Sequence, residues 1–275
     1  MSDPRATLEA IGQLPDAEID IADAALQLAR IDCPDADWES ARAHLSDLAR
    51  QAVTLADTID EDDVAARAIA LSGLLGGRYG YAGDTESYDD LANANLIRVI
   101  ERRRGLPVAL GILWLHTAQA TGWAGNGVDF PAHFLIALQG KSGQVVLDVF
   151  NGGTPLGVRD LRVLLKQVEG EKAELRPGLL RPVGPRRILL RLQNNIMTRR
   201  LQASDFAGAI TCIEDMLRIA PDQAELWKQA ASMHQHQEQI GAAMRCYDRF
   251  LRLIPEGPAA DRVRLAMEEL RSRLN

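Results

Sequence analysis

An internal repeat near the C-terminus constrains the fold more than any other feature of the sequence. Residues 207–221 and 241–255 align with an offset of 34 residues. The matched positions are Ala209 with Ala243, Cys212 with Cys246, Leu217 with Leu251, Arg218 with Arg252, and Pro221 with Pro255. A 34-residue period with a small residue inside the second helix and a closing proline is typical of paired-helix repeats that stack side by side. The C-terminal part is therefore predicted to be all-α.

This period resembles that of the tetratricopeptide repeat family. It predicts helices near residues 186–202, 205–219, 222–237, 239–253 and 258–273, the last a capping helix. Because Cys212 and Cys246 occupy equivalent repeat positions, we interpret their thiols as packing groups. Cys33 forms no C-x-x-C motif with them, so all three thiols are expected to be reduced and structural.

Before the repeat, the apolar pattern changes from helical to strand periodicity after Gly122. Helices are predicted at residues 7–32 with a break at Pro15, and at 35–58, 61–75, 92–104 and 107–121. Gly105 fits the left-handed cap of one helix, and Pro107 fits the first turn of the next. The segment 77–90 lacks periodicity and is expected to be a loop.

Strand signals follow at residues 128–130, 133–139 and 144–150, and the last two surround a glycine-bounded turn. We expect a mixed α+β domain at residues 1–169, a linker rich in proline and glycine at 170–186, and an all-α domain at 187–275.

The charge balance bears on the class of partner. Lys and Arg number 31 against 38 Asp and Glu, which gives a net charge of −7 and argues against a general nucleic-acid binder. The first residues have no secretory pattern, and no run approaches the ~18 apolar residues of a membrane span. We therefore expect a cytoplasmic protein without membrane contact. The sequence indicates no oligomeric state.

The hairpin places two titratable residues near each other. A two-residue turn at 141–142 sets the pairs Gly140 with Gly143, Leu135 with Asp148, and His133 with Phe150. His133 and Asp148 are then diagonal neighbours on one face, about 7 Å apart at the backbone. Spacing alone leaves two interpretations open. The carboxylate orients the imidazole as in a catalytic pair, or the histidine is structural and the aspartate caps a turn.

The same region resembles the bacterial SirB-type family of transglutaminase-like proteins with tetratricopeptide tails. The resemblance is carried by Asn93, by the run Arg102-Arg103-Arg104-Gly105-Leu106-Pro107, by Gly127-Val128-Asp129-Phe130-Pro131-Ala132-His133-Phe134, and by Asp148-Val149-Phe150-Asn151-Gly152-Gly153. It is densest over residues 73–157 and extends with the repeats to nearly the whole chain. The sequence departs from the family pattern at three positions. The family favours Gly at the position of Ala132 and Pro at that of Val149, and it often has Pro at that of Leu91. The resemblance implies a papain-like domain of helices and antiparallel sheet, with His133 and Asp148 as two members of a catalytic triad.

The third member of that triad is missing. In working transglutaminases the nucleophilic cysteine lies at the N-terminus of the buried helix, where the helix dipole and a histidine lower its pKa. The corresponding segment 105–110 has no Cys, Ser or Thr, and Pro107 stands at or beside the nucleophile position. Thr117 is about three turns away, ~15 Å along the helix. Cys33 would have to fold over the cleft, and we interpret it as a buried structural thiol.

Further candidates concern the cleft and possible ligands. The resemblance suggests Asn93, Arg103, Phe130 and Phe150 as cleft-lining residues, although a capping role is favoured for Asn93 and a capping or solvated role for Arg103. The acidic segment 84–90 lacks the spacing of an EF-hand, and His234 and His236 point to different helix faces. No metal or cofactor is therefore expected.

Three hypotheses of function follow. The favoured one is a non-catalytic module that binds a peptide or protein partner. The second is a hydrolase or acyl-transfer enzyme that uses His133 as general base, oriented by Asp148. The third is a purely structural scaffold in which these two residues form a satisfied core pair.

Overall fold

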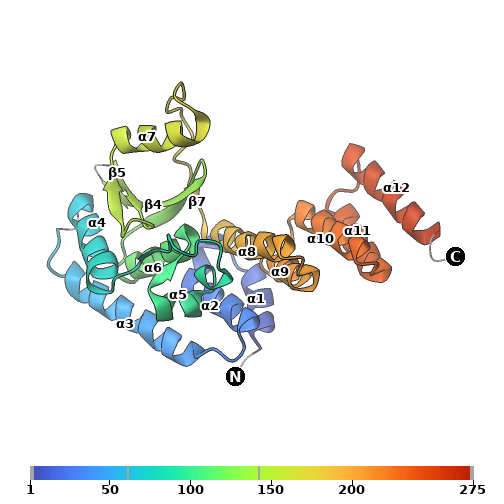
Figure 1. The fold of residues 1–275 in the computed structure, drawn as a ribbon, viewed down its shortest axis with the longest axis horizontal. Coiled ribbons are helices and arrows are strands. Elements are labelled where there is room, and N and C mark those ends of the chain that lie inside the picture. The colour runs from blue at the N-terminus through green and yellow to red at the C-terminus, as the bar shows by residue number, and fades with distance from the viewer. Residues whose placement is uncertain (1–2, 61, 142, 273–275) are drawn as a thin grey trace. The chain divides into compact units, whose positions relative to one another are not determined.

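The chain folds into two compact units in the computed structural model, which describes residues 3–60, 62–141 and 143–272 (Figure 1). One unit is Pro15–Leu192, and the other joins Met1–Leu14 to Gln193–Asn275. Ser142 of the predicted turn and the expected helix ends at residues 61 and 273 lie outside the described residues. The fold is mixed α+β, with an all-α repeat region.

The unit Pro15–Leu192 is built around a central apolar helix, α6. Its other elements are α2 (Ile21–Asp32), α3 (Trp38–Ala56), α4 (Val64–Ser72), β1 (Ala82–Gly83), α5 (Leu96–Arg102), β2 (Arg104–Gly105), β3 (Gly125–Phe130), β4 (His133–Gly140), β5 (Gly143–Asp148), β6 (Thr154–Leu156), α7 (Val158–Glu169) and β7 (Pro182–Val183). Short 3-10 turns at Asp16–Glu18 and Leu91–Asn93 and a π-helical stretch at Gly73–Arg78 connect them.

Helix α6 (Pro107–Ala120) begins where the sequence predicts and ends one residue earlier than predicted. Pro107 occupies its first turn, and Gly122 follows its end with a positive φ of 75°. The helix is apolar on all sides, which is typical of a buried helix. Helices α2, α3 and α5 contact it, and strands β3 and β4 pack against it as well. It therefore forms a layer between the helices and the sheet.

The five-stranded sheet has the order β6-β5-β4-β3-β7, with antiparallel pairing throughout. The β4–β5 pairs run from Gly140↔Gly143 to Ile136↔Leu147, which confirms the predicted register. The ladder stops before two of the predicted pairs, Leu135 with Asp148 and His133 with Phe150, and β5 ends at Asp148. His133 instead pairs with Phe130 of β3.

The two faces of the sheet have different coverings. Val128, Phe130, Leu135, Ala137 and Val146 form a buried cluster with two leucines of α7, Leu161 and Leu165. The alternate residues of β4 point the other way, since a side chain added at Gly111 of α6 would overlap the ring of Phe134. One face therefore belongs to α6 and the other to α7.

The structure corrects the predicted cap of α5. Arg103, not Gly105, takes the left-handed conformation at the helix end, with φ 57°. Gly105 lies in β2 and pairs with Gly83 of β1 in a short parallel ladder. A side chain at Gly105 would overlap Val99, so the glycine is needed for close packing.

The other unit contains the repeat helices and, unexpectedly, the N-terminal helix α1 (Pro4–Gly12). Its further helices are α9 (Phe206–Ile219), α10 (Ala224–His236), α11 (Ile240–Leu253) and α12 (Pro258–Ser272), and α8 (Pro185–Gln202) enters it from Gln193 onward. Consecutive repeat helices pack against each other, as α9 with α10, α10 with α11, and α11 with α12.

The observed boundaries differ from the expected ones because α1 packs on α9. A side chain at Gly12 would overlap the carbonyl oxygen of Arg218, so this contact requires glycine. Two ion pairs join the helices, Arg5 to Asp215 at 3.6 Å and Glu9 to Arg218 at 3.5 Å. Within the expected linker, Pro182–Val183 forms the edge strand β7 against β3.

Candidate functional site

The N-terminus of α6 and the start of β4 lie at the same end of the sheet. Gly111 of α6 lies close to Phe134 and Ile136 of β4. One turn further along α6, Leu115 lies near Leu138 of β4, since a side chain at Gly125 would contact both. Helix and strand therefore run in the same direction. Because β5 is antiparallel to β4, its last residue reaches this end too. Pro107, His133 and Asp148 consequently belong to one end of the domain.

The first turn of α6 carries no nucleophile. Pro107 is its first residue and lacks an N–H, and Leu106 before it provides no capping side chain. The following residues, Val108, Ala109 and Leu110, are apolar and buried. This turn therefore has neither a thiol nor a hydroxyl to attack an acyl group.

The imidazole of His133 lies on the face of the sheet that α7 covers. Its partner in the β3–β4 ladder is Phe130, a member of the α7-side cluster, and the two ring centroids are 6.4 Å apart. Paired residues point to the same face, so the ring is directed away from the α6 side. The backbone oxygen of His133 accepts a hydrogen bond from Arg191 at 3.3 Å.

Asp148 caps a turn. Its Oδ1 accepts from the backbone N–H groups of Phe150 at 3.0 Å and Asn151 at 3.3 Å, and its Oδ2 accepts from Nδ2 of Asn151 at 2.7 Å. The side chain is buried. No hydrogen bond or ion pair joins it to His133, although both residues lie within the described part of the chain. The structure brings the two to one end of the sheet without bonding them.

The turn after Asp148 is tied to the start of α6. The carbonyl oxygen of Phe150 accepts a hydrogen bond from the N–H of Gly83 at 2.8 Å, and Gly83 pairs with Gly105, two residues before Pro107. The ring of Phe150 covers Gly83 and meets the ring of Tyr88 edge-on, with centroids 5.9 Å apart. Among the four cleft-lining candidates, Phe150 is the one at this junction that stays partly exposed.

Two other cleft candidates are fully buried. Asn93 donates from Nδ2 to the backbone oxygen of Ser87 at 2.7 Å, and the backbone oxygen of Asn93 accepts from the N–H of Leu106 at 2.8 Å. It thus holds the 84–90 loop against the start of α6. Phe130 lies inside the α7-side cluster. Neither side chain can line an open cleft as the resemblance suggested, because both are at most 1% exposed.

Arg103, the remaining candidate, organises a polar cluster on α3. Its guanidinium donates to the hydroxyl of Tyr81 and lies 2.7 Å from Nε2 of His44, which is 2.9 Å from the same hydroxyl. Burial and the adjacent guanidinium lower the pKa of His44 to about 4, while Asp47 opposes this shift. The imidazole is therefore neutral near pH 7.

The acidic loop is fixed internally. Asp84 accepts hydrogen bonds from the N–H and hydroxyl of Ser87, and these bonds, with others, lower its pKa to about 2. Arg102 contacts Asp84 at 2.9 Å and Asp90 at 3.3 Å. Across the described ranges, no three His, Cys, Asp or Glu side chains come together as a possible metal site.

None of the cysteines has the environment of an activated thiol. Cys33 follows the last residue of α2 and is partly exposed instead of buried as expected, and its pKa is raised by burial and by Asp32. Burial and Glu214 raise the pKa of Cys246 to about 11. Cys212 is buried in α9. A reactive thiolate requires the opposite, an electropositive and accessible setting.

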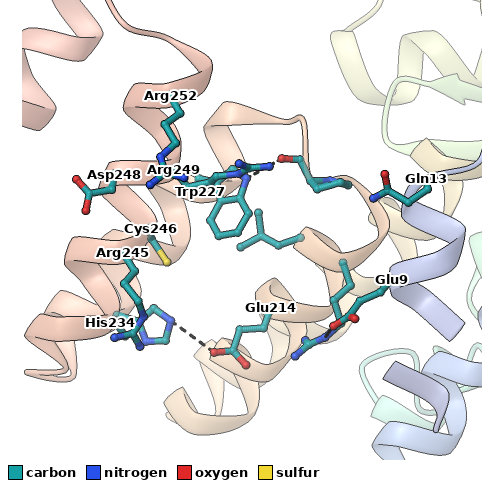
Figure 2. A pocket seen from close by; sticks show the side chains of 14 residues that line it. Glu9, Gln13, Glu214, Trp227, His234, Arg245, Cys246, Asp248, Arg249 and Arg252 are labelled. Carbon is teal, nitrogen blue, oxygen red and sulfur yellow. Dashed lines mark hydrogen bonds and ion pairs between the residues drawn. The ribbon is translucent and has the colours of Figure 1, made fainter. Parts of the chain in front are cut away.

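The repeat unit contains a groove that the sequence analysis missed. It has a volume of about 620 Å³ and is lined by α1, α9, α10 and α11 (Figure 2). Trp227 of α10 and three arginines of α11, Arg245, Arg249 and Arg252, contribute to its wall. Their spacing of four and three residues places the arginines on one helix face, a signal readable in the sequence.

Comparisons with known proteins agree with this architecture. The model of the transglutaminase-like superfamily matches residues 39–194, and a tetratricopeptide repeat model matches residues 196–268. The chain is 29% identical over 260 residues to a UPF0162 protein of Xylella fastidiosa, covering 92% of this chain and 91% of that protein. It is 28% identical over 253 residues to a UPF0162 protein of Vibrio cholerae, covering 92% and 93%.

A more distant similarity is confined to part of the chain. F-box only protein 21 of Homo sapiens is 25% identical over 167 residues, which are 57% of this chain and 26% of that protein. No solved structure matches the chain significantly. In the described residues, no helix has the length and apolar character needed to cross a membrane.

Proposed function

Because this chain belongs to the transglutaminase-like superfamily and carries C-terminal tetratricopeptide repeats, we propose that it is a non-catalytic member that binds a protein partner. The observation that supports the absence of catalysis is Pro107 at the first position of α6. Acyl transfer through a covalent intermediate needs a thiol or hydroxyl there, and proline supplies neither. The surrounding first turn is apolar.

The retained His133 and Asp148 support the same conclusion. An imidazole acting as general base needs an orienting partner and a path to the reacting atom. Here the carboxylate of Asp148 is engaged by Asn151 and the backbone of its own turn. The imidazole of His133 is on the α7 face, across the sheet from the face that α6 covers. We infer that the two residues shape the domain instead of forming a catalytic pair.

The repeat unit supplies the binding function in this proposal. Stacked helix pairs present concave surfaces to partner proteins. The groove between α1, α9, α10 and α11 has the size of a site for a few side chains of a bound segment. Helix α1 completes one wall, which gives the N-terminal segment a role in partner binding.

The purified full-length protein should show no turnover of amide or ester substrates that depends on His133. The measurement compares wild type with His133→Ala on a panel of chromogenic amides, esters and glutamine peptides with an amine acceptor. Activity present in the wild type and absent from His133→Ala would refute the non-catalytic assignment and favour a hydrolase or acyl-transfer enzyme.

Partner binding needs its own measurement. Cross-linking in cells followed by affinity purification should identify a protein that binds the purified chain directly and binds His133→Ala equally well. If no protein bound the purified chain directly, the interaction part of the proposal would fail and a purely structural role would be left.

A further inference from the structure

The groove of the repeat unit has an unusual concentration of unpaired positive charge. Arg245, Arg249 and Arg252 are exposed and lie along one side of α11. Within the described part of the chain, none of their guanidinium groups forms an ion pair with a carboxylate, whereas most other arginines of this unit do. Figure 2 shows them along one wall, with Glu9 of α1 and Gln13, which follows α1, on the opposite side.

The carboxylates in and beside the groove are largely engaged elsewhere. Glu9 lies 3.5 Å from Arg218, which also holds the buried Asp215 at 2.9 Å. Glu214 lies 3.6 Å from Nε2 of His234. Asp248 lies on α11 itself, and its carboxylate points away from Trp227 in Figure 2. These carboxylates lie beside the groove, but within the described part of the chain none of them forms an ion pair with an arginine of α11.

An aromatic platform lies next to these cations. The indole N–H of Trp227 donates to the carbonyl oxygen of Pro221 at 2.9 Å, which fixes the plane of the ring. The guanidinium of Arg249 is 5.9 Å from the ring centroid. The thiol of Cys246 in the same wall stays neutral, because burial and Glu214 raise its pKa to about 11. A fixed indole beside arginines is a common arrangement of binding hot spots.

We propose that this groove binds an extended acidic segment of a partner protein, with carboxylates on the α11 arginines and an apolar side chain on Trp227. The inference rests on the proposed partner-binding function and adds the chemical class of the partner. Arg245 and Arg252 are seven residues apart, so they are about 10 Å apart along the helix. An extended chain in the polyproline II conformation advances about 3.1 Å per residue and returns every third side chain to the same side, so two acidic residues three positions apart span that distance and face the same helix.

Nucleic acid is the competing polyanion, and the protein's overall charge disfavours it. The chain carries a net charge of −7, and the three arginines are flanked by Asp248, Glu214 and Glu9. A continuous phosphate backbone would meet these carboxylates, whereas a peptide can place single acidic side chains between them. The indole platform also fits an aliphatic side chain of a peptide.

The test uses the full-length protein and a short fluorescein-labelled peptide with the sequence Glu-Ala-Leu-Glu at its centre. Fluorescence anisotropy measures the affinity of this peptide. The same measurement is made with a peptide that has Gln in place of both Glu residues, and with labelled oligo-uridine. Each exposed ion pair contributes about two- to fivefold in affinity. We expect the acidic peptide to bind about tenfold more tightly than the Gln peptide, and to weaken as salt is raised.

The variants test whether binding depends on the arginines of the groove or on positive charge anywhere on the repeat unit. The triple variant R245Q/R249Q/R252Q should lose about tenfold in affinity for the acidic peptide, and Trp227→Phe should weaken it through loss of the fixed indole. The control R262Q/R264Q/R271Q removes the same charge from α12 and should bind like the wild type. Circular dichroism verifies that each variant is folded.

Three results would overturn the inference: equal binding of the Glu and Gln peptides, equal loss in the α12 control, or tighter binding of oligo-uridine than of the acidic peptide. These results leave the proposed function intact if a partner found by cross-linking still binds the purified chain. If no partner binds while the peptide results hold, the groove assignment stands and the proposed partner function fails.

Discussion

The role of Asp148 can be decided by combining its removal with that of His133. In the structure three hydrogen bonds end on the Asp148 carboxylate, two from backbone N–H groups and one from Asn151. Asp148→Ala leaves these donors without a partner at a buried position. At about 1 kcal/mol for each bond, the expected loss is about 3 kcal/mol in the free energy of unfolding of the transglutaminase-like unit.

His133→Ala removes a partly exposed ring that packs on Phe130 and should cost about 0.5–1 kcal/mol. Because the two side chains share no hydrogen bond or ion pair, the double variant should lose the sum of the single losses. The coupling energy should then lie within about 0.5 kcal/mol of zero. A catalytic-type pair predicts instead a coupling of about 1 kcal/mol or more.

Urea unfolding monitored by tryptophan fluorescence can measure this cycle in a Trp227→Phe background. The remaining tryptophans, Trp38, Trp114 and Trp123, all belong to Pro15–Leu192, so the signal reports that unit. Equal m-values across the four proteins are required for the comparison. A coupling above 1 kcal/mol, or a loss for Asp148→Ala below about 1 kcal/mol, would refute the assignment of Asp148 to its turn.

Three further predictions address other parts of the chain. Gly12→Ala forces a methyl group into the Arg218 carbonyl and should lower the stability of the repeat unit by about 2 kcal/mol or release α1, measured by urea unfolding and limited proteolysis. Ala132→Gly should raise stability by about 0.5 kcal/mol in thermal unfolding, because Ala132 has a φ of 55° and glycine removes that strain at some entropic cost. Lowering the pH from 6.5 to 4 should destabilise the fold through His44, since the unfolded chain binds this proton near pH 6.5 and the folded chain only at about 4. Partial exposure reduces the effect to about 1–2 kcal/mol, and His44→Gln should flatten that part of the pH profile, whereas an unchanged profile would contradict the pKa of His44 that burial and Arg103 lower.

The sequence predicted elements whose boundaries are marked by local chemistry. Pro107 and Gly122 delimit α6, and the 34-residue period with its closing prolines places α9 and α11 within one residue of their observed starts. The hairpin register followed from the glycines at 140 and 143. In each case a residue with restricted or unusual backbone freedom fixes the boundary.

Features that depend on contacts distant in sequence were missed. The strand β7, which lies within the expected linker, is one of them. Helix α7 (Val158–Glu169) was also not predicted, although Leu161, Leu164 and Leu165 recur at helical spacing and give it a local signal. Two-residue strands such as β1 and β2 have no periodicity to detect. The docking of α1 on α9 depends on Gly12 meeting a backbone more than 200 residues away, and no local pattern encodes that contact.

The candidate site shows why spacing predicts neighbours better than it predicts bonds. Strand alternation predicted His133 and Asp148 as diagonal neighbours on one face and left open whether the carboxylate orients the imidazole or caps a turn; in the structure its hydrogen bonds are those of a turn cap. Asn151 and the N–H groups of the turn are three residues away at most, so they need no chain rearrangement to reach it. Hydrogen bonds within the turn are an alternative to a contact between Asp148 and His133. They are favoured here because the same turn holds Phe150 against Gly83. The carboxylate of Asp148 therefore stabilises the turn that holds Phe150 against Gly83, next to the start of α6, and this role requires no bond to His133.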